Sequence, residues 1–200
     1  ADPRHSDRMP MASSPAVRRA ALRLLIEIGG PGDPSARQAL DFALLQAAGA
    51  ERLAALEQLL GRDDAADLGT ATLARLIIEA RKGPLAGDDV AAVVLACAVV
   101  RGRVSETQAG DLGWLVATGD RATATAAAGA LAAAPPPGLP LAEIAARARS
   151  GDPVVRNAIL NLLLRINPSV TAESAAGTPW QQLAEHRVQL LRWEVGGFVK

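Results

Sequence analysis

Two segments that lie far apart in this chain have similar sequences. Residues 15–28 (PAVRRAALRLLIEI) align without gaps to residues 153–166 (PVVRNAILNLLLRI), and eight of the fourteen positions are identical. In both segments a proline stands where a helix begins, and aliphatic residues follow at helical spacing. A chain that repeats a helix in this way is expected to fold by stacking similar helical units.

Capping signals locate the helices along the chain. Ser105 and Gln108 match the capping box, and Gly83-Pro84 after two basic residues is typical of a helix end. Aspartates stand where N-caps are expected, at positions 33, 88, 120 and 152. The expected helices are 15–29, 34–48, 51–60, 65–82, 88–102, 105–117, 120–133, 140–149, 152–166 and 179–195. No segment long enough for a strand alternates with period two, so we predict an all-α fold.

The spacing of the helices indicates a regular array. Pairs of helices begin at residues 15, 51, 88, 120 and 152, so their separations are 36, 37, 32 and 32 residues. Such a period is typical of helical hairpins, because one hairpin cannot bury its apolar face without a neighbour. We therefore predict about five antiparallel hairpins in a single domain over 14–200, with 1–13 a polar tail outside it.

The opening of the repeated helix resembles a known family. Asp152-Pro153-Val-Val-Arg156, with its partial copy Asp33-Pro34-Ser-Ala-Arg37, is similar to the bacterial HEAT-like repeat. The resemblance covers mainly 14–29 and 152–166, and it implies a short right-handed α-solenoid. It also implies that Arg18, Arg37 and Arg156 make structural contacts between repeats. The alternative is an anion-binding ladder, since HEAT-like DNA glycosylases use a basic concave face.

Charge and composition limit the possible partners. The chain has 21 basic and 21 acidic residues, so no net field attracts nucleic acid or an anionic membrane, and neither partner is expected. Nearly all basic residues are arginine, which favours a GC-rich, bacterial coding sequence. The longest apolar run, 90–100, is too short to span a bilayer. We therefore expect a soluble, cytoplasmic protein. Cys97 is the sole cysteine, which excludes a disulfide within the chain.

Residues that could perform catalysis are few. Asp63, Asp64 and Asp67 spell D-D-x-x-D, which resembles the magnesium–diphosphate motif of all-α terpene synthases. The preferred interpretation is that these acids favour the start of the following helix. A nucleophilic pair of Cys97 and His186 is conceivable, but a cysteine within an apolar run is typical of an inert core thiol. We expect no catalytic, metal or cofactor site and no small-molecule ligand.

The last expected helix carries the candidate interaction surface. Four residues share a face distinct from its apolar stripe: Gln182, His186, Gln189 and Trp193. An indole among polar groups is a common anchor of protein interfaces. The alternative is that Trp193 packs under the C-terminal tail and closes the array.

The sequence therefore predicts a non-enzymatic protein–protein interaction module: an adaptor, or a regulatory or inhibitory subunit, that binds another protein. The alternative is a HEAT-like nucleic-acid-binding or DNA-repair protein of the glycosylase type, which would need a cationic concave face and aromatic groups. A lyase or ligase acting on a cofactor is a third hypothesis, which rests on family analogy alone.

Overall fold

The computed structural model describes residues 15–29, 33–47, 49–60, 65–149 and 152–166. All regular structure in this part of the chain is helical, and no strand occurs in it. The nine helices are α1 (Pro15–Gly29), α2 (Pro34–Leu45), α3 (Ala50–Leu59), α4 (Ala66–Lys82), α5 (Gly87–Val99), α6 (Glu106–Thr118), α7 (Arg121–Ala133), α8 (Leu141–Ala148) and α9 (Pro153–Ile166). The all-α prediction is confirmed for these residues. The helix expected at 179–195 lies outside them.

Several helices begin at the predicted caps. The carboxylate of Asp33 accepts hydrogen bonds from the backbone N–H groups of Ser35 (2.7 Å) and Ala36 (3.4 Å). The carboxylate of Asp152 likewise accepts hydrogen bonds from the backbone N–H groups two and three residues later, at 2.8 and 3.4 Å. Each Asp-Pro pair therefore starts its helix with the same local geometry, in which two otherwise unpaired donors are satisfied. The prediction for Asp88 was wrong, because α5 begins at Gly87 with Ala86 at its N-cap, and Asp88 lies within its first turn.

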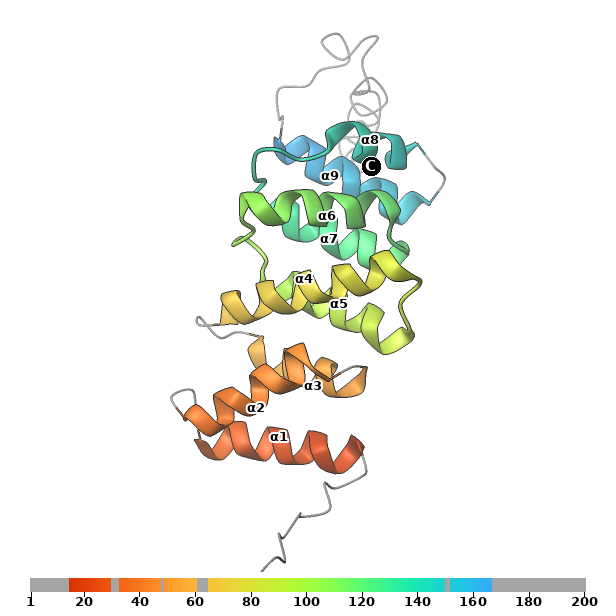
Figure 1. Ribbon diagram of the computed structural model, residues 1–200. Coiled ribbons are helices and arrows are strands. Elements are labelled where there is room, and N and C mark those ends of the chain that lie inside the picture. Colours follow the sequence, from red (N-terminus) through yellow and green to blue (C-terminus); the bar gives the residue numbers. More distant parts are fainter. Residues whose placement is uncertain (1–14, 30–32, 48, 61–64, 150–151, 167–200) are drawn as a thin grey trace, which may run out of the picture.

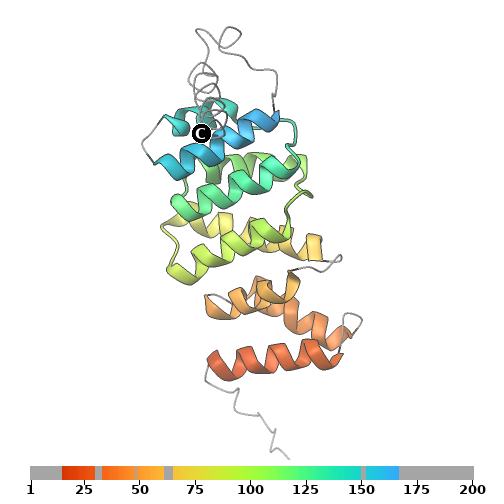
Figure 2. The ribbon, with the colours of Figure 1, turned by 180° about the vertical axis from the view of Figure 1, so that it is seen from behind.

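The helices form two rows that run the length of an elongated stack (Figures 1 and 2). In one row α1, α3, α5, α7 and α9 pack in succession, each on the next. The second row contains α2, α4, α6 and α8 in the same order. Leucine, alanine, valine and isoleucine side chains between the rows form one continuous core. Helices α1 and α9 therefore belong to the same row, four layers apart.

Close contacts group the helices into pairs. Four hairpins, α2–α3, α4–α5, α6–α7 and α8–α9, pack closely within themselves, whereas α3–α4, α5–α6 and α7–α8 are not among the well-packed pairs. Connections inside the hairpins (46–49, 83–86, 119–120, 149–152) are shorter than those between them (60–65, 100–105, 134–140). The first predicted pair, α1–α2, also packs closely, but from α2 onward the close pairs are one helix out of phase with those predicted from 51, 88 and 120. In the described residues α1 packs on α2 and α3, and no helix precedes it.

Helix α7 carries mostly alanine, which lets its neighbours approach closely. Its Ala124, Ala127 and Ala128 are fully buried. The helix packs against α5 and α9 in its own row and against α6 in its hairpin. A larger side chain on this face would have to displace one of these helices.

Replacing Ala127 or Ala130 with leucine is therefore expected to lower the free energy of unfolding by about 1–3 kcal/mol through overpacking. Gly129 is the matched control, because it is exposed on the same helix and an added Cβ would meet nothing within 4 Å. Gly129→Ala should stabilise the protein by about 0.5–1 kcal/mol. Urea unfolding of the three variants measures these differences. Unchanged stability of both leucine variants would show that α7 is loosely packed.

Candidate protein-interaction site

The interaction face predicted from the sequence lies beyond the part of the chain that the structure describes. This is true of all four of its residues: Gln182, His186, Gln189 and Trp193. The described residues therefore offer no geometry for that site, and the proposed role of Trp193 stays a prediction.

The acidic motif is only partly within the described residues. Asp67 lies exposed in the first turn of α4, where a carboxylate is favoured by the helix dipole, and Asp63 and Asp64 lie outside the described ranges. Within those ranges no three side chains of histidine, cysteine, aspartate or glutamate are grouped as metal ligands would be. Asp67 is thus placed as the preferred interpretation requires.

Cys97 lies in the core, as expected from its apolar surroundings in the sequence. Its side chain is buried in α5, and burial raises the pKa of its thiol to about 12. A thiol with so high a pKa is protonated at neutral pH, whereas a nucleophilic cysteine must be a thiolate. The structure therefore gives Cys97 a packing role.

Arg52, which was not among the residues singled out from the sequence, joins α3 to the two following helices. Arg52 of α3 is buried and donates from both terminal nitrogens to the Glu79 carboxylate, at 2.7 and 3.2 Å. It also donates to the Ala47 carbonyl at 2.7 Å and lies 3.5 Å from Asp89 of α5. The hydrogen bond from Arg52 is the main reason that the pKa of Glu79 lies below its usual value of 4.5. This cluster ties α3 to α4, α5 and the preceding turn.

A pattern in the sequence could have identified this arginine. The buried positions of α3 include 52, 55, 56 and 59, which is the spacing of one helical face. Arg52 therefore stands in an otherwise apolar stripe, and a charge there must find a partner. By contrast, Arg37 and Arg156, which the family resemblance assigned to contacts between repeats, have exposed side chains. Their structural role is not visible among the described contacts.

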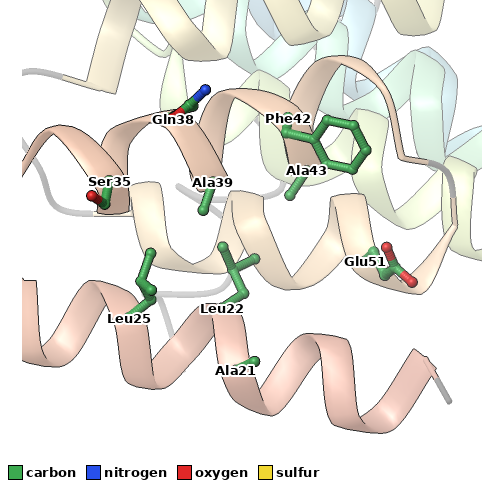
Figure 3. A pocket seen from close by; sticks show the side chains of 9 residues that line it. All are labelled: Ala21, Leu22, Leu25, Ser35, Gln38, Ala39, Phe42, Ala43 and Glu51. Atoms are coloured by element: carbon green, nitrogen blue, oxygen red, sulfur yellow. The ribbon is translucent and has the colours of Figure 1, made fainter. Parts of the chain in front are cut away.

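An apolar groove lies between α1 and α2 (Figure 3). Its volume is about 530 Å3. Six apolar residues line it: Ala21, Leu22, Leu25, Ala39, Phe42 and Ala43. Leu22 and Leu25 point from α1 toward α2, while polar groups enter only through Ser35, Gln38 and Glu51 (Figure 3). Of the α1 side chains whose burial the structure describes, only Leu22 is buried, so this helix is incompletely packed.

The apolar surface continues from the groove across α1. Val17, Leu24 and Ile28 are 51%, 56% and 77% exposed, and their spacing of seven and four residues places them on one helix face. Phe42 on α2 is 58% exposed at the edge of the groove. The remaining large exposed apolar side chains of the described chain, Leu60, Ile78 and Val154, belong to three other helices or their ends. The concentration at one end of the stack distinguishes this surface.

A second hollow, of about 330 Å3, lies between the 83–85 connection and α6. Trp114 lines it, but the guanidinium of Arg81 covers the indole, 5.1 Å from the ring centre. Arg81 is itself held by Asp111 at 2.7 Å. The aromatic surface is therefore already used within the protein, which makes this hollow a weaker candidate than the α1–α2 groove.

Comparisons of the chain with protein families, with curated proteins and with solved structures find no match. Among the helices that the structure describes, none combines the length and the apolarity needed to cross a membrane. The kind of partner that the α1–α2 groove could bind therefore follows from the geometry of the groove. A long apolar groove with few polar groups suits an amphipathic helix, whose apolar face it would cover.

Proposed function

We propose that this chain is a non-enzymatic protein-interaction module, an adaptor or a regulatory or inhibitory subunit, built as a right-handed HEAT-like α-solenoid. The two rows of successive helices and the repeated Asp-Pro helix starts support the repeat architecture. The proposed module acts in the cytoplasm and binds its partner at the α1–α2 end.

The observation that carries this proposal is the apolar surface formed by the α1–α2 groove and the exposed face of α1. Apolar side chains exposed in water are unfavourable unless another surface covers them. The lining of the groove is mostly apolar, so a partner that covers it removes mainly apolar area from water.

Photo-crosslinking in the native cells tests the proposal. A photoreactive phenylalanine analogue at position 42 replaces a side chain that is already aromatic and exposed, so it leaves the fold intact. We expect it to capture one discrete polypeptide. The matched control carries the analogue at Ile78, which is 50% exposed on α4, away from the groove.

Adding Leu25→Asp to the position 42 variant should abolish the captured product, because a carboxylate in the groove would be desolvated by the partner. Circular dichroism checks that this variant stays folded. Equal capture from positions 42 and 78, or capture that survives Leu25→Asp, would contradict the proposed site.

The proposal also predicts weak binding to nucleic acid. The acidic and basic residues balance at 21 each, so few counterions would be released when the chain meets a duplex. We expect a dissociation constant for duplex DNA no tighter than about 1 μM at physiological salt, measured by fluorescence anisotropy. A tighter, strongly salt-dependent constant would favour the nucleic-acid-binding alternative.

A further inference from the structure

The two similar helices α1 and α9 differ sharply in how they are covered. Leu162 and Leu163 of α9 are fully buried. The residues aligned to them in α1, Leu24 and Leu25, are 56% and 38% exposed. The same motif therefore presents its apolar face to a core in one helix and to solvent in the other.

The position of each helix in the stack explains this difference. Helix α9 packs on α7, the preceding helix of its row, and on α8, the first helix of its own hairpin. Helix α1 is the outermost helix at one end of the stack and packs only on α2 and α3, which follow it (Figures 1 and 2). Within the described residues no helix takes the places that α7 and α8 take for α9. In this part of the chain α1 therefore lies in the same row as α9 but has its apolar face uncovered.

We infer that the exposed face of α1 is a stacking surface for a helical hairpin of another protein, which covers it as α7 and α8 cover α9. This inference rests on the proposed function and adds the class of partner. The expected hairpin presents small and aliphatic side chains, because α7 buries mainly alanine with Leu131, and α8 buries Ile144 and Ala145. Small side chains allow the helices to approach closely, and larger ones fill the groove between α1 and α2.

A hairpin fits this surface better than a second copy of the chain. Pairing two copies through α1 would bring two identical helices together, whereas in the stack α9 is covered by two different helices, α7 and α8. An apolar patch of this kind covers a few hundred Å2, on the order of half of the roughly 800 Å2 that each partner buries in a standard interface. Two helices that contact α1 from two sides, as α7 and α8 contact α9, extend the buried area.

An extended chain tests whether α1 accepts such a hairpin. A copy of residues 119–152, which contain α7 and α8, is placed directly before Pro15, so that Asp152 of the copy precedes Pro15 as it precedes Pro153. We expect the melting temperature to rise by about 5 °C or more. Amide exchange in α1 should slow by about 10-fold or more.

The control is the same extension with Leu24→Asp and Ile28→Asp in α1, which should show neither the rise nor the protection. In the unextended chain these two substitutions should leave the melting temperature within about 2 °C, since both side chains are exposed. An extension that gives no rise in melting temperature and no protection of α1 would overturn the inference.

The natural partner is tested with a photo-crosslinker at Ile28. It should capture a protein in cells that express the unextended chain, and the extension should abolish this capture by occupying the face. Capture that persists in the extended chain would overturn the inference. So would a dimer of the unextended chain at about 100 μM that Leu24→Asp converts to monomer by light scattering, because the occupant would then be a second copy.

The two proposals can fail separately. If position 42 captures a partner but the extension leaves α1 unprotected, the helical-hairpin inference is wrong and the proposed function stands. If neither position 42 nor position 28 captures a protein, the proposed function itself is wrong.

Discussion

Replacing Arg52 with alanine is expected to lower the free energy of unfolding by about 3 kcal/mol at pH 7. The substitution removes both hydrogen bonds to Glu79 and the one to the Ala47 carbonyl. It leaves the Glu79 carboxylate partly buried without its strongest partner, and a void remains where the side chain was. Urea denaturation followed by circular dichroism measures the loss.

Arg75→Ala is the matched control. Arg75 donates to the same carboxylate at 2.9 Å, but its side chain is 55% exposed, so its removal should cost less than about 1 kcal/mol. Equal losses of unfolding free energy in the two variants would show that the buried Arg52 contributes no more stability than the exposed Arg75.

The same ion pair predicts a pH dependence. Because the pKa of Glu79 is lowered in the folded protein, the stability from this group is fully present above its usual pKa of 4.5. It is lost as the pH falls through the lower folded-state pKa. The decrease in stability between neutral and acidic pH should therefore be smaller in Arg52→Ala than in the unsubstituted protein. An identical decrease in both would contradict the assignment.

The second large effect should appear in only one of two equivalent leucines. Leu162→Ala in α9 is expected to lower the free energy of unfolding by about 2–5 kcal/mol, because a fully buried side chain is removed from between helices. Leu24→Ala, at the aligned position of α1, should change it by less than about 0.5 kcal/mol, because that side chain is 56% exposed.

This pair needs no further matched variant, because each leucine controls for the other. Both lie in the interior of a helix with nearly the same sequence, so the change in helix propensity is the same. The difference between the two variants therefore reports tertiary packing alone. Comparable losses at both positions, measured by urea unfolding, would show that α1 is covered in solution.

The helices themselves could be predicted from the sequence because their ends depend on local interactions. Asp33 and Asp152 accept hydrogen bonds from residues two and three positions ahead, so no distant part of the chain is needed to start α2 or α9. The alanine-rich composition of 121–133 is likewise a local feature of the sequence that permits close packing, and Ala127 is fully buried.

The candidate site could not be predicted in this way. The pattern of the sequence favoured the face around Trp193, which lies outside the described residues, whereas residues 15–29 stood out only as a copy of the repeat. That the apolar face of α1 is uncovered depends on which helices of the described chain pack against it. Such neighbours are not encoded in the helix's own residues.

What the sequence determined by itself is therefore the helical class, the start of each Asp-Pro helix and the approximate period of the array. Only the tertiary structure decided the pairing into hairpins. The repeat length along the sequence is the same whichever helix is counted as the first of a pair, so it does not determine the pairing. It also decided the burial of Arg52, whose partner Glu79 is 27 residues away in the chain. Finally, it assigned opposite environments to Leu24 and Leu162, because burial depends on contacts between distant segments, and these differ at the end and in the interior of a stack.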